Sequence, residues 1–495
     1  MKPPSSPSTA SGPAFRFLER WFHLRRHGTT AGREVMAGLT TFAAMAYILV
    51  VNPSILKDAG MPRAALVTAT AVGAAMATLL MAFMANLPLA MAPGMGINAF
   101  FAYTVCLGMG VPWQDALGLV FVNGILFLLL SVTGVREKIV AALPNSLKAA
   151  VCAGVGLFIA FIGLKNGGLV AAHPATFVSL GDLTSPPVAL FAAGLLITCV
   201  LVARGTPAAI LISMGVITLI GFAVPDGKGG AVTNPPGAVF SLPAPMDGTF
   251  LKLRFDFLTS DPLKALPVIL TLLLVDMFDN IGTLIGVTKR AGLMDKNGHV
   301  PNLPQALAAD SLAAIGSSLL GTSTVVSYIE SATGVQAGGR TGLTGVTTAV
   351  CFLLALFLTP VILMIPAVAV APALVVVGIL MFESVSEIEV HRFENAAPAI
   401  LTLMFMPMTF SISTGIGVGI IALVALRLGL WPGRKKRAAP MDGPHLGFDA
   451  DPADGGMADS RESRRGLSPV TYVLAVIFVL HFLERWIFQL FSHRS

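Results

Sequence analysis

Two aspartates inside a long apolar stretch constrain this chain more than any other feature. The stretch Leu272–Val287 reads LLLVDMFDNIGTLIGV, and it carries Asp276 and Asp279. A carboxylate at the depth of a lipid bilayer is costly, so it is rarely retained unless it has a function. Two side chains that lie three residues apart on a helix point to one face. The stretch therefore predicts a membrane-spanning helix whose acidic face lines a polar cavity.

The composition of the whole chain agrees with a membrane protein. Of the 495 residues, 55% are hydrophobic and only 12% are charged, whereas a soluble protein carries about 25% charged residues. Only helices and closed barrels satisfy their backbone in lipid, and barrel strands alternate in polarity. We therefore expect an all-α polytopic membrane protein with lipid as its surroundings. The net charge of +6 is typical of basic cytoplasmic loops and gives no reason to expect a nucleic-acid partner.

Fourteen candidate spans lie on either side of a polar loop at residues 225–261. They are predicted at Val35–Leu56, Ala64–Leu87, Leu87–Leu107, Trp113–Val132, Leu147–Leu164, Val188–Ala203, Pro207–Val224, Pro262–Val287, Leu303–Leu320, Ser323–Ala337, Leu343–Ile365, Pro372–Ser386, Asn395–Thr409 and Ser411–Trp431. We expect the first span to end at a break at Asn52-Pro53. The residues 35–224 and 262–431 thus form two halves of seven segments.

The loops indicate how the halves are oriented. Most Lys and Arg residues fall in the loops that lie on the same side of the membrane as the N-terminus, including the run Arg434–Arg437. Because such loops are typically cytoplasmic, this predicts a cytoplasmic N-terminus. An odd number of spans in each half means that the second half enters from the opposite face. Two halves of opposite orientation are what an inverted repeat requires.

The third segment of each half is interrupted. The stretch Leu87–Gly96 contains two prolines and two glycines, so a continuous helix is not expected there. In the second half, the strand-like Thr322–Ser327 precedes the helical Tyr328–Val335, which contains Glu330. Interrupted segments at corresponding positions point to a binding site near the middle of the membrane. The N-termini of the two half-helices would supply N–H donors to a ligand.

The predicted site is acidic and has no basic residue in the middle of a span to balance it. Its carboxylates are Asp276, Asp279, Glu330 and, close to the start of its own span, Asp310. Transport of a small anion would more naturally use basic residues or helix N-termini alone. The acids suit a bound cation or a neutral substrate rich in N–H donors, with one carboxylate carrying a transported proton. Asn98 has both a donor and an acceptor and fits the same site.

Both ends of the chain lie outside the two halves. Residues 1–34 form a leader without the pattern of a signal peptide, and Phe15–Leu24 resembles an amphipathic helix lying on the membrane, with Phe15, Leu18, Trp21 and Phe22 on one face. A loosely ordered basic leader is the alternative. Residues 432–468 form a polar linker, and residues 469–495 form a hydrophobic helix that either spans the membrane or lies in its interface.

No catalytic constellation is evident, so we do not expect an enzyme, a metal or a cofactor. The four cysteines, Cys106, Cys152, Cys199 and Cys351, all fall within apolar spans, and the eight histidines are scattered without metal-ligand spacing. No nucleophile elbow or phosphate-binding loop is present in the pattern.

Four long stretches of the chain resemble the AzgA-like purine permeases, a branch of the nucleobase–cation symporter-2 (nucleobase–ascorbate) superfamily. They are AGLTTFAAMAYILVVNPSIL (Ala37–Leu56), MAPGMGINAFFAYTV (Met91–Val105), DMFDNIGTLIGV (Asp276–Val287) and LLGTSTVVSYIESATGVQAGGRTGLTGV (Leu319–Val346). The resemblance implies fourteen segments in two inverted repeats, with segments 1–4 and 8–11 in a core domain and 5–7 and 12–14 in a gate domain. Segments 3 and 10 would be half strand and half helix.

The resemblance also implies a function: proton-coupled import of adenine, guanine or hypoxanthine by alternating access across the inner (plasma) membrane. Asn98, Asp276 and Glu330 match positions assigned to purine binding, and Asp279 matches one linked to substrate binding or proton coupling. The related uracil permeases have a histidine linked to protonation where this chain has Thr283, so that role must fall on a carboxylate here. We expect Asp276 to bind substrate and Asp279 to carry the proton.

Further site candidates come from the two broken segments. They are Gly94, Gly96, Tyr328 and Ile329, with Phe100 and Phe101 as secondary candidates for stacking on a flat ligand. Alternatives are a transporter of xanthine or uracil, coupling to sodium instead of a proton, and a small-anion transporter of similar fold. A homodimer is one assembly compatible with this class.

Overall fold

The computed structural model describes residues 13–133, 143–227, 229–294, 300–428 and 468–492. Before the long loop it contains α1 (Pro13–Phe22), α2 (Ala31–Met45), α3 (Ile48–Leu56), α4 (Arg63–Met84), β1 (Met91–Pro93), α5 (Met95–Ala99), a π-helical segment (Phe100–Gly108), α6 (Trp113–Thr133), α8 (Asn145–Asn166), β2 (Val170–His173), β3 (Phe177–Leu180), α9 (Pro186–Ala203) and α10 (Ala209–Ile220). After it come α11 (Asp256–Ser260), α12 (Pro262–Arg290), α13 (Leu303–Leu320), β4 (Val325–Ser327), α14 (Ser331–Gln336), α15 (Gly342–Ala355), α16 (Thr359–Met364), α17 (Ala367–Phe382), α18 (Phe393–Met408), α19 (Ile412–Arg427) and α21 (Pro469–Ser492).

The chain is a helical, multi-pass membrane protein. Within the described residues, seven helices are long and apolar enough to cross a membrane, and four further apolar helices are shorter. A helix lies within each of the fourteen predicted ranges, some with shifted ends: α17 begins five residues before Pro372, which lies inside it. The antiparallel hairpin β2–β3 between α8 and α9 was not predicted. Residues 429–431, the predicted end of the fourteenth span, lie outside the described residues.

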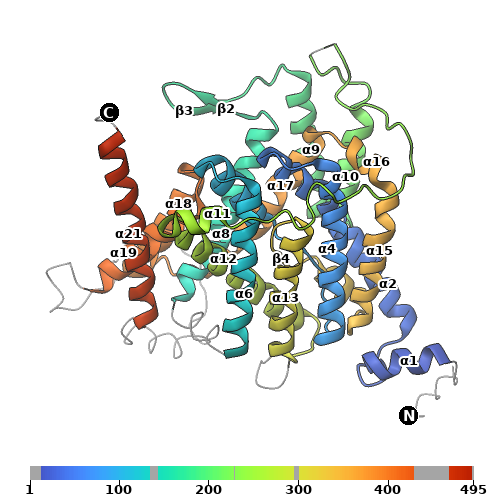
Figure 1. Cartoon of the computed structure of the whole chain (residues 1–495). Coiled ribbons are helices and arrows are strands. Elements are labelled where there is room, and N and C mark those ends of the chain that lie inside the picture. The colour runs from blue at the N-terminus through green and yellow to red at the C-terminus, as the bar shows by residue number, and fades with distance from the viewer. Residues whose placement is uncertain (1–12, 134–142, 228, 295–299, 429–467, 493–495) are drawn as a thin grey trace, which may run out of the picture.

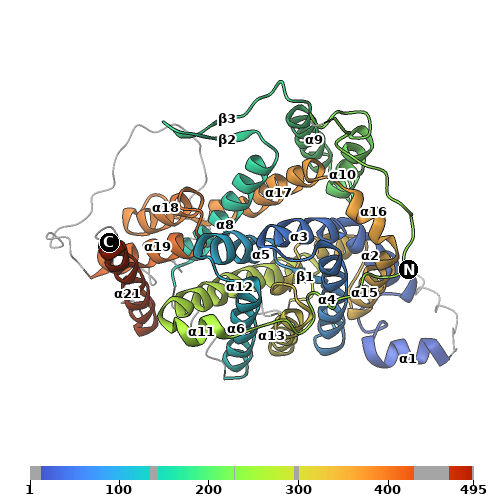
Figure 2. The ribbon, with the colours of Figure 1, turned by 45° about the horizontal axis from the view of Figure 1, so that its top comes forward.

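The helices pack in two groups (Figure 1, Figure 2). The strand group contains α2 to α6 and α12 to α15 together with β1 and β4. The flanking group contains α8 to α10 and α17 to α19, with α8 packed on both α17 and α18. Contacts between the groups are sparser than those within them, and they join α2, α3, α5 and α12 to α8, α10, α17 and α19. Figure 2 shows β1 inside the strand group, near α3 and α4, and α5 next to α8 of the flanking group.

The first span is interrupted earlier than predicted. The expected break at Asn52-Pro53 is wrong, because α3 continues through Pro53 to Leu56. The helix breaks instead at Ala46 and Tyr47, where Leu49 and Val50 form hydrogen bonds to the carbonyls only three residues earlier. Pro53 removes one backbone hydrogen-bond donor from α3. The packing of the buried residues around it outweighs the loss of that hydrogen bond. The buried Asn52 amide also donates to the hydroxyls of Thr70 and Thr322, at 2.7 and 3.0 Å.

At the N-terminus, α1 is helical as predicted but packs partly on the protein. Phe22 is buried in a cluster with Leu24 and Leu343, while Trp21 is half exposed and contacts the ring of Phe83. The predicted apolar face is therefore shared between the protein and the surroundings of the helix.

Candidate functional site

A pair of short buried strands brings the two interrupted segments together. β1 and β4 pair antiparallel, with Met91 opposite Ser327 and Pro93 opposite Val325. Backbone bonds extend the ladder at both ends, from Gly94 N–H to Thr324 and from Tyr328 N–H to Ala90, each 3.0 Å long. The prolines before Gly94 prevent a helix there, while the Thr- and Val-rich stretch before Ser327 favours a strand. Because α5 follows β1 and α14 follows β4, the two short helices begin at opposite ends of the ladder.

Asn98 lies on α5 and is completely buried. Its side-chain oxygen accepts a hydrogen bond from the Ser323 hydroxyl. Its Nδ2 group donates to no described residue. Asn98 therefore presents an amide donor beside the strand pair, and Ser323, which precedes β4, holds that amide in place.

Asn280 links three elements around Asp276. Its amide nitrogen donates to Asp276 at 2.9 Å and to Asp310 of α13 at 2.8 Å. Its side-chain oxygen accepts the backbone N–H of Ser327 at 2.8 Å. All three side chains are buried. A single amide thus ties the acidic face of α12 to a second helix and to the end of β4.

Glu330 lies between β4 and α14 and is partly exposed. Tyr47, from the break between α2 and α3, donates its hydroxyl to Glu330 Oε1 at 2.5 Å. Tyr328 turns its own hydroxyl to the carbonyl of Pro93, at 2.6 Å. The first segment of the chain therefore contributes to the site as well as the two interrupted ones.

The two aspartates of α12 have different surroundings. Asp276 is directed toward Asn280 and α13, whereas Asp279 is partly exposed and lies within electrostatic range of Glu330 and of Cys152 on α8. Asp279 therefore lies near the boundary between the strand group and the flanking group. Thr283, one turn further along, is almost fully buried.

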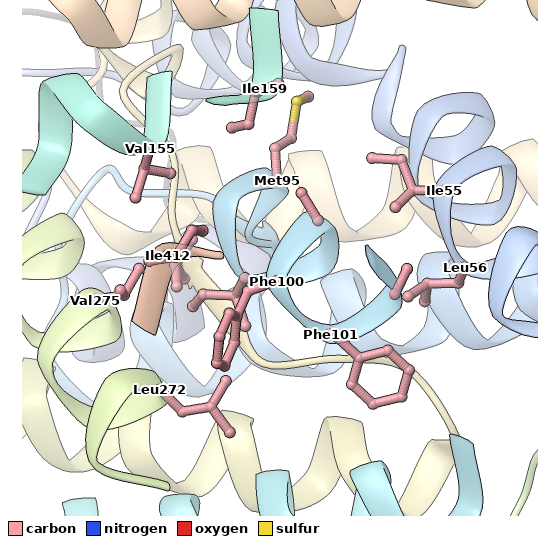
Figure 3. Close-up of a cluster of buried hydrophobic side chains, with 14 of the residues drawn as sticks. Ile55, Leu56, Met95, Phe100, Phe101, Val155, Ile159, Leu272, Val275 and Ile412 are labelled. Carbon is pink, nitrogen blue, oxygen red and sulfur yellow. The ribbon is translucent and has the colours of Figure 1, made fainter. Parts of the chain in front are cut away.

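The remaining candidates fall into two sets. Gly94 and Gly96 lie on the ladder and on α5, and a Cβ added at Gly96 would overlap Val155 of α8. Ile329 is half exposed. Phe100 and Phe101 are buried in an apolar cluster with residues such as Leu56, Met95, Leu272, Val275 and Ile412 (Figure 3).

Three residues that contribute to this arrangement were missed in the sequence. Tyr47 lies in a stretch that was noted for its resemblance, but nothing local marks it as a partner of Glu330. Asn280 had a usable signal, because it is a polar residue one helical turn after Asp276 in an otherwise apolar stretch. Ser323 was hidden among the small polar residues that precede β4.

The carboxylates of the site accept hydrogen bonds from hydroxyl and amide groups. No group of three or more His, Cys, Asp or Glu side chains in the described part of the chain is arranged to hold a metal ion. The recorded hydrogen bonds of the site come from hydroxyls, amides and backbone N–H groups. Such a site can accept hydrogen bonds from a neutral ligand through carboxylates and donate one through Asn98.

Known permeases are similar in sequence to this protein over most of its length. The sequence pattern of the permease family matches residues 32–418. The adenine permease AdeP of Escherichia coli K12 is 43% identical over 86% of this chain and 93% of its own length. The guanine/hypoxanthine permease PbuO of Bacillus subtilis 168 is 42% identical over 83% of this chain and 95% of its own length. The transmembrane domain of the cyanobacterial bicarbonate transporter BicA superposes with a TM-score of 0.59, at 15% identity, over 79% of this chain and 97% of that domain.

Proposed function

The chain belongs to the permease family, and we infer that it is a transporter of purine nucleobases. The inference depends on identities of 42–43% to an adenine permease and a guanine/hypoxanthine permease over more than 90% of each relative. The matched region includes every residue of the site described above. The likeness to the bicarbonate transporter, at 15% identity, supports the fold alone.

For the architecture, we propose two inverted repeats of seven segments, with the strand group as the core domain and the flanking group as the gate domain. The interrupted segments β1–α5 and β4–α14 would be the third segment of each repeat. The sparse contacts between the two groups support a movement of one against the other. Alternating access by such a movement would expose the site to each side of the membrane in turn.

For the substrate, we propose that a purine lies beside the β1–β4 ladder. Glu330 would accept hydrogen bonds from the N–H edge of the purine, and the Asn98 amide would donate to an oxo group or a ring nitrogen. One observation supports this most strongly: the ladder and its hydrogen bonds connect Asn98, Glu330 and, through Asn280, Asp276 into one polar cluster.

For coupling, we propose that uptake is driven by a proton carried on one of the α12 aspartates. Asp279 suits this role because it is partly exposed and lies within electrostatic range of Glu330, so its charge would be felt at the substrate. We also propose that the chain lies in the inner membrane with a cytoplasmic N-terminus, from the distribution of Lys and Arg.

Radiolabelled uptake tests the proposal. Glu330→Gln and Asp276→Asn should each abolish purine uptake while the protein remains in the membrane, and Glu19→Gln, a change in α1 far along the chain from the site residues, should leave uptake intact. Competition by adenine, guanine, hypoxanthine, xanthine and uracil at two pH values would report the preferred base and the proton dependence together. Full uptake by both acidic-site variants would refute the proposed site, and uptake of uracil alone would refute the purine substrate.

A further inference from the structure

We propose that Tyr47 is a positioning residue for substrate recognition, holding one oxygen of Glu330 so that the other faces the purine. This role rests on the proposed binding of purine by Glu330. It adds a residue from the first segment of the chain to a site that the sequence places only on segments three, eight and ten.

The break in the first span is what brings Tyr47 to the site. Tyr47 lies between α2 and α3, and its side chain is completely buried. After it, the N–H groups of Leu49 and Val50 donate to carbonyls three residues earlier instead of four. Irregular backbone within a membrane segment is tolerated where it is buried in protein or lines a cavity. Here it directs the hydroxyl onto the carboxylate of Glu330, 283 residues further along the chain.

The geometry separates the two oxygens of Glu330. Oε1 accepts the Tyr47 hydroxyl at 2.5 Å, and among the described residues no other side chain donates a hydrogen bond to the Glu330 carboxylate. A tyrosine hydroxyl has a single proton to donate, so Tyr47 cannot occupy both oxygens. Hydrogen bonds to a charged acceptor are short and among the stronger ones. The carboxylate is therefore fixed at one oxygen and presents the other.

Tyr328 does not have the same role, although it is only two residues from Glu330. Its hydroxyl donates to the carbonyl of Pro93 in β1. It therefore ties the two interrupted segments to each other, while Tyr47 ties the first segment to the carboxylate. Loss of each hydroxyl should consequently have a different signature.

Without its hydroxyl, position 47 would leave Glu330 free to rotate and to bind water in place of substrate. We expect Tyr47→Phe to raise KM about ten-fold, the effect of losing one hydrogen bond to a charged group. The maximal rate should stay within about two-fold, since the ring still fills its buried space. Tyr472→Phe, which removes a hydroxyl from α21, is the matched control and should leave both values unchanged.

Selectivity between purines distinguishes a positioning role of Tyr47 from a role in packing alone. The transported purine and its mono-N-methylated analogues would be compared as inhibitors, because methylation removes the N–H that a fixed carboxylate recognises. For each protein, the inhibition constant of the analogue that the unmodified protein rejects most strongly is divided by that of the purine. This ratio should be several-fold smaller in Tyr47→Phe than in the unmodified protein. Tyr47→Leu, a second variant without a hydroxyl donor, should show the same smaller difference between purine and analogue. It would be measured as ligand-induced thermal shift in detergent-purified protein.

An unchanged KM or an unchanged ratio in both variants would overturn the role of Tyr47. The proposed function fails separately, and it would do so if the unmodified protein took up no purine or if Glu330→Gln transported normally. Loss of uptake in Glu330→Gln together with normal selectivity in both Tyr47 variants would therefore reject only the positioning role.

Discussion

The backbone N–H of Ser327 donates to the side-chain oxygen of Asn280 at 2.8 Å, and this bond joins the end of β4 to α12. The same amide donates from its nitrogen to Asp276 and to Asp310. All of these groups are buried, so water cannot replace a lost partner. Asn280 therefore holds α12, α13 and the end of β4 in register.

We expect Asn280→Leu to destabilise the protein and abolish purine uptake. A buried polar group left without its partner costs about 1–3 kcal/mol, and Ser327 would lose its acceptor. Asn280→Asp keeps the size but cannot donate as a carboxylate, so it should fail as well. Thermal unfolding followed by size-exclusion chromatography would measure the loss of stability.

Asn123 of α6 supplies the control for this experiment. It is also a fully buried asparagine, but its side chain forms no hydrogen bond to any described residue. Asn123→Leu should be neutral or stabilising because it removes an unsatisfied group. Equal melting temperatures for Asn280→Leu and Asn123→Leu would show that the Asn280 bonds contribute nothing.

Gly96 marks a close approach between α5 and α8. A Cβ at this position would overlap Val155 Cγ1, while the next nearest atoms are at ordinary contact distances of 3.7 and 3.9 Å. Gly96→Ala should impair transport, since overpacking costs about 1–3 kcal/mol and valine has little rotamer freedom. The paired change Gly96→Ala with Val155→Ala removes the single obstacle and should restore uptake in the same assay. Failure of the pair to recover would mean that α5 needs glycine for its backbone and not for its contact with α8.

Glu34 is a buried carboxylate that the sequence did not single out. It accepts the backbone N–H groups of Arg340 and Thr341, at 2.9 and 3.2 Å, and the hydroxyl of Thr344 at 2.6 Å. It thereby ties α2 to the start of α15. Glu34→Ala would leave two backbone donors without an acceptor, at about 1–3 kcal/mol each, and should lower the melting temperature by several degrees.

The half-buried Glu19 of α1 provides the comparison for Glu34. It accepts the backbone N–H of Arg25 through two long contacts of 3.3 Å, and surface changes of this kind stay within about 0.5 kcal/mol. Glu19→Ala should therefore have the same melting temperature as the unmodified protein. If Glu34→Ala did the same, the connection between α2 and α15 would be dispensable.

The sequence predicted those features of the site that have local causes. Prolines and glycines around Gly94, and β-branched residues before Ser327, predicted the two interruptions because they act on the backbone in their own neighbourhood. The acids of α12 were recognisable because a carboxylate is conspicuous in an apolar stretch. These signals located the strand pair but not its register.

The partners of the acids could not be predicted, because they depend on tertiary packing. Tyr47 and Glu330 are separated by 283 residues, and Asn280 and Asp310 by 30. The position of the first break was wrong for the same reason. Pro53 is a local signal for a break, yet the buried hydrogen bonds of the adjacent Asn52 keep α3 continuous. Tertiary contacts thus override a local preference there.

The C-terminal helix α21 gives a topological prediction. Its 24 residues extend roughly 36 Å at 1.5 Å per residue, enough to cross a hydrocarbon core of about 30 Å.

The two faces of α21 also favour a span. Leu474, Ala475 and Phe478 are buried against the protein, and the residues on its outer face, Val473, Val476, Leu480 and Leu483, are apolar and exposed. A helix that lay in the membrane interface would have a polar outer face, whereas the apolar outer face of Pro469–Leu483 favours a span. Glu484 and Arg485 follow this apolar part. Figure 1 shows α21 running in the same general direction as α6 and α13. If the N-terminus is cytoplasmic and fourteen spans precede it, as proposed above, α21 should place the C-terminus outside. An alkaline phosphatase fused after Ser495 should then be active and a green fluorescent protein dark, and the reverse pair of results would place α21 in the cytoplasmic interface.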